Sequence, residues 1–277
     1  MQLTIDLNGL VNRLSQAKVV SPWRELRLLL CFIQQRSYED VFLNPCINQA
    51  QYTILEGLVE RRMQGEPLSK IVGKREFWGL PFIITPHTLD PRPDSETLVE
   101  AVLNVFPKKH SPLRFVDFGT GSGCLLLSLL YEYAQAFGIG VDKNFLALTV
   151  AQENADRLGL TKRVSFYGGD WAQALQGKFD VLMSNPPYIA MGEMLDVAVC
   201  QYDPPCALYG GRDGLQAYKN LLPQMRALMH PESWLFLEIG QGQGHEVRHI
   251  ASGQGLLFKE SYLDLAGIER VLAFQSG

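Results

Sequence analysis

About the first 65 residues carry apolar side chains at helical spacing, which predicts a small bundle of amphipathic helices. Ser21-Pro22 suits the start of one helix, because serine is a favoured N-cap and proline fits a first turn. Asn48 predicts the start of another, with Gln51 at the capping-box position. The apolar stripes comprise Leu26, Leu29, Leu30 and Ile33, then Ile54, Leu55, Leu58 and Val59. We interpret these stripes mostly as core and place a helical domain at residues 1–75.

Further along the chain, short apolar runs alternate with longer helical stretches. This alternation is typical of a parallel sheet covered by helices. Ala266-Gly267 joins the last two runs and predicts an antiparallel pair. The predicted strands are 113–118, 137–141, 164–168, 179–184, 234–239, 256–264 and 269–274. We therefore expect an α/β domain with a seven-stranded mixed sheet at residues 96–277, preceded by a hairpin linker at 76–95.

A glycine-rich turn follows the first of these strands and consists of Gly119, Thr120, Gly121, Ser122 and Gly123. Strand, glycine turn and apolar helix together indicate a nucleotide site, because glycine lets a ligand approach the backbone closely. Asp142 ends the second strand about 20 residues later, where an acid can accept both hydroxyls of a ribose. These features fit either a dinucleotide or S-adenosylmethionine.

The glycine spacing favours S-adenosylmethionine. A dinucleotide fingerprint has the form Gly-x-Gly-x-x-Gly, whereas here the third glycine, Gly123, comes one residue early. Asp117, two residues before the first glycine, is placed to meet a positively charged ligand such as a sulfonium amino acid; a cap is the alternative role. Asp170 and Trp171 follow the third strand and are candidates for contacting the adenine, with core packing as the alternative for Trp171.

The tetrapeptide Asn185-Pro186-Pro187-Tyr188 directly follows the fourth strand. Proline lacks an N–H and fixes φ, so this segment leaves the strand as a stiff ribbon. The Asn185 side-chain oxygen and a proline carbonyl then form two acceptors at fixed spacing beside an aromatic ring, which suits a planar NH2 group. An ordinary turn is the alternative for these four residues alone. Because ligands bind at the carboxyl edge of such sheets, we expect all four loops to line one cleft.

Composition and charge limit the classes of substrate and the cellular location that we expect. The chain has 277 residues, of which 47% are hydrophobic, enough for two domains with cores. A net charge of −4 without a dense Lys/Arg run disfavours duplex DNA as the substrate. The five cysteines form no Cys-x-x-Cys pair and are typical of reduced thiols, and no metal site is visible. With no signal pattern and no long apolar run, we expect a cytoplasmic protein without a membrane span.

Together these motifs resemble the class I S-adenosylmethionine-dependent methyltransferases, which have a Rossmann-like fold. Among them the chain is similar to the HemK/PrmC family, the protein-(glutamine-N5) methyltransferases of peptide chain release factors. The segment Asn185–Tyr188 is shared with nucleic-acid amino-methyltransferases, whereas Pro91-Arg92-Pro93-Asp94-Ser95-Glu96 is more particular to this family. The remaining similar segments are 67–73, 75–80, 207–215, 237–240 and 265–270.

The resemblance implies direct SN2 transfer of the sulfonium methyl to the glutamine of the Gly-Gly-Gln motif in class I release factors. Asn185 and the Pro186 carbonyl would accept the two amide N–H bonds, with Tyr188 on the amide plane and no catalytic base before the methyl moves. The other implied substrate contacts are Pro187, Arg92 and Glu96. The helical domain would hold the protein substrate, and we expect the enzyme to be a monomer.

Three alternatives stay open at this point. An amino-methyltransferase acting on adenine or cytosine would use the same Asn185 loop, but should carry a basic groove or a target-recognition domain. A glutamine of a ribosomal protein is another substrate. A non-enzymatic binding protein predicts a broken site, whereas Asn185, Tyr188 and Asp142 are all present.

The chain departs from the family pattern at three positions, Lys70, Asp90 and Asp203. Asp203 keeps the charge of the usual glutamate. Asp90 flanks the segment that the family folds over its active site, so it can alter how the acceptor peptide is seated.

Overall fold

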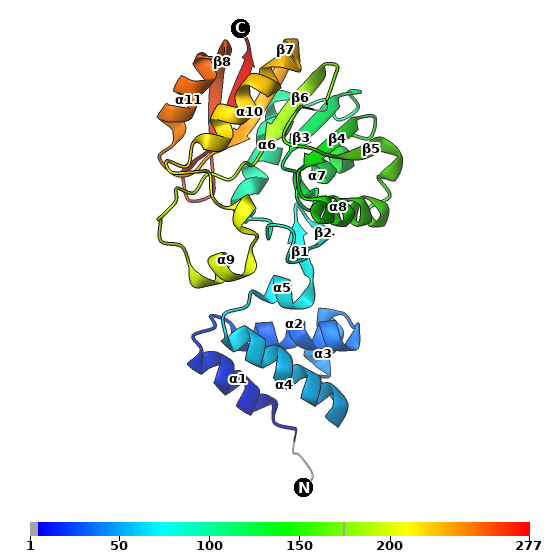
Figure 1. Ribbon diagram of the computed structural model, residues 1–277. Helices are drawn as coiled ribbons and strands as arrows, with labels where there is room; N and C mark the ends of the chain where they lie inside the picture. Colours follow the sequence, from blue (N-terminus) through cyan, green and yellow to red (C-terminus); the bar gives the residue numbers. More distant parts are fainter. Residues whose placement is uncertain (1–4, 174) are drawn as a thin grey trace. The chain divides into compact units, whose positions relative to one another are not determined.

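The computed structural model describes residues 5–173 and 175–277, which form two compact units (Figure 1). The smaller unit contains the described residues up to Gly73 together with Asp196–Tyr202. The larger unit contains the described residues of Lys74–Leu195 and Asp203–Gly277. No helix in the described part of the chain combines the length and the apolar character needed to cross a membrane.

The smaller unit is helical. The predicted capping box is present, because Asn48 accepts a hydrogen bond from the Gln51 N–H and the Gln51 side chain accepts one from the Asn48 N–H. Most of the predicted stripe residues are buried in one cluster, although Ile54 is exposed. The elements are α1 (Leu7–Gln16), α2 (Pro22–Gln34), α3 (Tyr38–Leu43), α4 (Gln49–Met63), α5 (Leu68–Val72) and α9 (Val197–Tyr202).

The larger unit contains the predicted seven-stranded mixed sheet, with strand order β5-β4-β3-β6-β7-β9-β8. Neighbours from β5 to β7 are parallel, and β9 runs antiparallel to both β7 and β8. The strands are β3 (Arg114–Phe118), β4 (Phe137–Asp142), β5 (Val164–Gly168), β6 (Phe179–Ser184), β7 (Met229–Glu238), β8 (Leu256–Leu263) and β9 (Glu269–Ser276). Strand β7 begins earlier than predicted, because polar residues interrupt the apolar run that marks it. A hairpin of β1 (Lys74–Phe77) and β2 (Leu80–Ile83) precedes the sheet.

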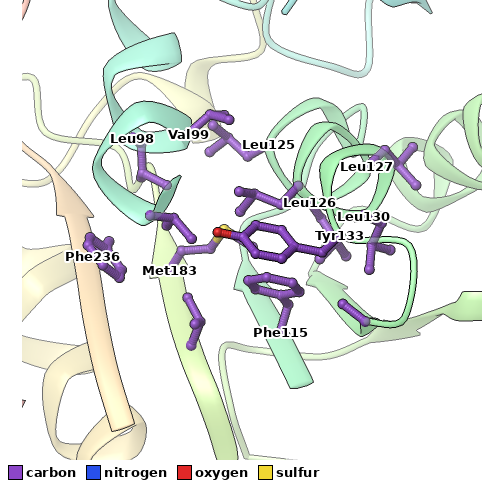
Figure 2. Close-up of a cluster of buried hydrophobic side chains, with 14 of the residues drawn as sticks. Leu98, Val99, Phe115, Leu125, Leu126, Leu127, Leu130, Tyr133, Met183 and Phe236 are labelled. Carbon is purple, nitrogen blue, oxygen red and sulfur yellow. The ribbon is translucent and has the colours of Figure 1, made fainter. Parts of the chain in front are cut away.

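Helices cover both faces of this sheet, and side-chain alternation along the strands divides the core accordingly. Phe115 and Met183 belong to the cluster with α6, α7 and α8, whereas Val116 and Leu182 belong to the cluster with α10 and α11. Figure 2 shows the first cluster, in which Tyr133 lies over Phe115 and donates its hydroxyl to the Phe106 carbonyl. The helices are α6 (Glu96–Val105), α7 (Cys124–Glu132), α8 (Phe145–Arg157), α10 (Gln216–Ala227) and α11 (Gly244–Ser252); short 3-10 turns are η1 (Pro93–Ser95), η2 (Thr161–Arg163) and η3 (Pro205–Ala207).

Candidate active site

A cleft of about 700 Å³, open to solvent, lies at the carboxyl ends of β3, β4, β5 and β6. The predicted residues on its surface are Gly119, Gly121, Asp142, Asp170, Trp171, Asn185 and Pro187. The four loops that the sequence places at one sheet edge therefore meet around one cleft.

The glycine turn is held against the end of β4 by hydrogen bonds to the Val141 carbonyl and to the Asp142 side chain. The Val141 carbonyl accepts the N–H groups of Gly119 and Thr120, and Asp142 Oδ2 accepts the Gly121 N–H at 2.9 Å. Gly119, Gly121 and Gly123 all have positive φ, a conformation that side chains rarely adopt. Asp142 Oδ1 also accepts the N–H of Asn144, which caps α8. The Asp142 carboxylate thus binds both the glycine turn and the residue that caps α8. Its oxygens have further lone pairs that can accept hydrogen bonds from a ligand.

Asp117 lies behind the glycine turn and is almost fully buried. Its Oδ2 accepts a hydrogen bond of 2.7 Å from the Thr120 hydroxyl, whereas no described residue donates to Oδ1. Burial raises the pKa of this carboxyl to about 7, with a smaller contribution from the nearby Asp142, although the Thr120 hydrogen bond opposes the shift. A buried acid with an unsatisfied oxygen favours a cationic group nearby.

Trp171 lies on the cleft surface and also packs against the sheet core, so both interpretations of this residue apply. Its ring is next to Gly119: a β-carbon on Gly119 would lie 3.8 Å from Trp171 Cζ3. The backbone of Trp171 is left-handed, with φ of 55°. Such a conformation is costly for an aromatic residue and is found most often at functional sites. Asp170 beside it is exposed.

Asn185 leaves the end of β6 with its side-chain orientation fixed by a buried neighbour. Its Nδ2 donates a hydrogen bond of 3.0 Å to the hydroxyl of Ser95 in η1. The Pro186 carbonyl accepts no hydrogen bond from any described residue. The Asn185 oxygen and the Pro186 carbonyl are thus both available as acceptors, as the sequence predicts.

Tyr188 directs its hydroxyl into the protein, where it donates to Glu238 Oε1 at 3.3 Å. Burial and the Glu238 charge raise the pKa of Tyr188 far above its usual value, so the phenol stays protonated. Glu238 itself is 1% exposed, and burial raises the pKa of its carboxyl to about 7, although Ser95, Arg270 and the Tyr188 hydroxyl favour its charged form. The sequence suggested a structural role for this acid, and its hydrogen bond with Tyr188 connects it to the Asn185–Tyr188 segment.

Two glycines, Gly210 and Gly214, allow the backbone to pack closely behind the Asn185–Tyr188 segment. A β-carbon on Gly210 would lie 2.6 Å from the Gly214 carbonyl oxygen and closer still to that of Pro187. The Gly210 N–H donates to the Ile189 carbonyl, and Gln243 donates to the Tyr188 carbonyl at 2.8 Å. The Asn185–Tyr188 segment is therefore held in place by close backbone contacts and by the Gln243 side chain.

The segment that carries Arg92 and Glu96 makes contacts of its own. Arg92 donates to Asp203 Oδ2 at 2.6 Å, and the same carboxylate accepts the Asp90 N–H at 3.1 Å. Asp90, one of the unusual residues, is buried and lies 3.7 Å from the Arg75 guanidinium. The Glu96 carboxylate accepts the N–H of Trp78. The substrate contacts assigned to Arg92 and Glu96 stay predictions.

Several residues of the cleft escaped the sequence analysis. Lys143 and Asn144 directly follow Asp142, which was an available signal. Ser95 does not line the cleft; it stands inside the distinctive 91–96 segment, and only its contact with Asn185 indicates a role. The remaining lining residues are His87, Thr88, Leu89, Val141, Gly169, Pro204, Cys206 and Ala207. Most of these lie in loops whose position depends on the tertiary fold.

Comparison with known proteins gives matches along most of the chain. Residues 7–73 match the model of the PrmC N-terminal domain, and residues 109–248 match that of a methyltransferase domain. The release factor glutamine methyltransferase of Rhodospirillum rubrum is 42% identical over 94% of this chain and 81% of that protein. The Agrobacterium fabrum protein of the same name is 36% identical over 99% of this chain and 97% of its own length.

Solved structures support the fold alone. A methyltransferase from Pyrococcus furiosus superposes with a TM-score of 0.54 at 17% identity, covering 72% of this chain and 90% of that one. A ribosomal protein L11 methylase from Lactobacillus delbrueckii gives a TM-score of 0.51 at 17% identity, covering 70% and 84% of the two chains.

Proposed function

Since this chain belongs to the family of release factor glutamine methyltransferases, we propose that it methylates the glutamine of the Gly-Gly-Gln motif in class I peptide chain release factors. The methyl group comes from S-adenosylmethionine and goes to the side-chain amide nitrogen. The observation that carries the proposal is the pair of free acceptors, Asn185 Oδ1 and the Pro186 carbonyl, beside a cleft for the cofactor.

The residues of the cleft fit S-adenosylmethionine. Asp142 would accept the ribose hydroxyls while it holds the glycine turn, and Trp171 and Asp170 would contact the adenine. The cationic amino-acid end would satisfy the buried Asp117 Oδ1. The glycine turn, Gly119 to Gly123 with Thr120 and Ser122, would form the floor. The cofactor supplies an electrophilic methyl group on a positively charged sulfur.

The residues of this chain would act on the acceptor glutamine by orienting its side-chain amide. An amide nitrogen is a weak nucleophile because its lone pair is delocalised into the carbonyl. Asn185 Oδ1 and the Pro186 carbonyl would accept its two N–H bonds and so direct the nitrogen at the methyl, with Pro187 and Tyr188 shaping the pocket. Correct positioning alone can lower a barrier by about 7 to 11 kcal/mol. The high pKa of Tyr188 argues against a role as a base.

The helical unit offers a surface for the protein substrate. Phe42 and Leu43 are 54% and 81% exposed, and the Arg27 guanidinium stacks over the rings of Trp23 and Phe42. Exposed apolar side chains beside a stacked arginine are typical of protein interfaces. We propose that this surface, Trp23, Arg27, Phe42 and Leu43, binds the folded release factor. We further propose a monomer that works in the cytoplasm, where release factors act, and not on DNA.

The test is transfer of labelled methyl from S-adenosylmethionine to purified release factor, with the site located by mass spectrometry. We expect label on the Gly-Gly-Gln glutamine, none on a factor with Ala at that position, and much weaker labelling of the isolated peptide, which lacks the remote contacts. Label on nucleic acid, on a ribosomal protein in preference to the factor, or equally efficient labelling of the peptide would contradict the proposal.

A further inference from the structure

Helix α8, which lies beside β2 (Figure 1), contains a fully buried asparagine, Asn154. Its Oδ1 accepts the Ile83 N–H at 2.7 Å, and its Nδ2 donates to the Ile83 carbonyl at 3.0 Å and to the Ser122 carbonyl at 2.9 Å. Both N–H donors of the amide are thereby used. Because Ile83 ends β2 and Ser122 belongs to the glycine turn, one side chain joins these two segments.

The three contacts allow only one orientation of the Asn154 amide. Two of the groups around it are carbonyl oxygens, which only accept hydrogen bonds, and the third is an N–H, which only donates. The reversed amide would place its oxygen against both carbonyls and its NH2 group against the Ile83 N–H. At a fully buried position each such mismatch destabilises the fold. Asn154 therefore holds the end of β2 and the glycine turn at a fixed spacing.

Both segments lead into the surface of the cofactor cleft, although Asn154 itself does not line it. The glycine turn that contains Ser122 contributes two of its glycines to that surface. Residues 87–89, which follow shortly after Ile83, contribute three more side chains or backbone groups. A change in the spacing that Asn154 sets would thus alter the cleft without removing any group that touches the cofactor.

Further contacts show that α8 supports the glycine turn and the loop after β2. A β-carbon on Gly123 would lie 3.3 Å from the β-carbon of Ala151, which is one turn before Asn154 on the same face of the helix. At the start of α8, Asn144 Nδ2 donates to the His87 carbonyl at 3.1 Å. Within this arrangement, Asn154 is the side chain that forms hydrogen bonds with both the glycine turn and β2.

We propose that Asn154 is a positioning residue for the cofactor, which keeps the glycine turn in the conformation that binds S-adenosylmethionine. Without the two N–H donors, the buried Ser122 carbonyl loses this partner, and the turn of the free protein occupies other conformations as well. The apparent affinity then falls in proportion to the fraction of the protein whose turn is competent to bind. The inference rests on the cofactor of the proposed function and not on its acceptor substrate.

The first test is Asn154→Asp, which keeps the size of the side chain and the acceptor for the Ile83 N–H but replaces the NH2 group by an oxygen. We expect calorimetric titration to show S-adenosylmethionine affinity at least about 5-fold weaker, which corresponds to a competent fraction of about one fifth or less. Asn154→Ala, which adds no charge, should lose affinity in the same direction.

The matched control is Ser233→Ala. Ser233 is also fully buried, accepts the His230 N–H and donates to the Phe179 carbonyl at the start of β6, at the opposite end of the strand from the cleft. Thermal unfolding should show that this variant is destabilised, whereas its S-adenosylmethionine affinity should stay at the wild-type value. A loss below about 5-fold in folded Asn154→Asp, or an equal loss in Ser233→Ala, would overturn the proposal.

A second measurement uses the wild-type protein and needs no variant that folds. Because Asn154 joins the Ile83 N–H to the glycine turn, cofactor binding should also protect this N–H against local opening. We expect saturating S-adenosylmethionine to slow hydrogen exchange of the Ile83 N–H at least about 5-fold more than that of the His230 N–H, which donates to Ser233. A smaller difference between the two positions would overturn the proposal.

Neither measurement involves an acceptor substrate. A wild-type protein that shows both effects but does not methylate the release factor would therefore contradict the proposed function alone, and the role of Asn154 would stand.

Discussion

Gly210→Ala should disturb the reaction through the backbone of the acceptor segment. The added β-carbon would lie 2.6 Å from the Gly214 carbonyl oxygen and even nearer to the Pro187 carbonyl oxygen. Carbon and carbonyl oxygen atoms normally approach no closer than about 3.3 Å. Because both obstacles are backbone atoms, the Asn185–Tyr188 segment must move by about 0.7 to 1 Å. A displacement of about 1 Å in a group that orients a reactant can cost about 100-fold in rate.

We therefore expect single-turnover methylation of the release factor to slow by about 100-fold in Gly210→Ala. Calorimetric titration should show a much smaller loss in S-adenosylmethionine affinity, because only Asn185 and Pro187 of the moving segment line the cleft and the glycine turn and Asp142 stay in place. Circular dichroism and thermal unfolding would check that the fold is kept.

Gly57→Ala is the matched control. No atom lies within 4 Å of a β-carbon added there, and the residue is inside α4. It should leave activity unchanged and stabilise the protein by about 0.5 to 1 kcal/mol. A folded Gly210→Ala protein with turnover within about 3-fold of wild type would refute the reasoning that the rigid segment sets the rate.

Three further predictions concern the cleft, and a fourth concerns the helical unit. Asp142→Ala should weaken S-adenosylmethionine binding by about 1.5 to 3 kcal/mol in calorimetric titration, and unchanged affinity or preferred binding of NAD would contradict the cofactor assignment. Asn185→Ala should keep the fold and cofactor affinity but lose about 100-fold or more in single-turnover rate. Because burial raises the pKa of Asp117 to about 7, this acid is ionised in the free protein only as pH rises, so S-adenosylmethionine affinity should increase toward about pH 7 and level off above it. The free energy of unfolding of the free protein should fall between about pH 4 and 7, where the unfolded chain has lost the proton that buried Asp117 still holds. Asp117→Asn should flatten both trends. Leu43→Ser should raise KM for the whole release factor but not for the isolated peptide, and equal effects on both would remove the docking role of the helical unit.

Local patterns predict much of this fold because each element is marked by nearby residues. The capping box of Asn48 and Gln51 depends on four consecutive residues, and the apolar runs of β3, β4 and β6 are continuous because these strands are buried on both faces. Strand β7 is extended at its start by Met229, which pairs with Phe179 of β6, before the polar residues at a shift in the register. This pairing comes only from the folded sheet. The ends of such elements are the least predictable part.

The sequence by itself determined the chemistry of the site: the glycine turn, the acid Asp142 and the acceptors of Asn185-Pro186. These features are encoded in short segments, and the parallel topology brings the ends of their strands to one edge. The tertiary structure alone decided what holds them. The contact of Ser95 with Asn185 joins residues 90 positions apart, and that of Tyr188 with Glu238 spans 50. Such contacts leave no periodic trace in the sequence, because a hydrogen bond depends on the distance between atoms in space and not on their separation along the chain.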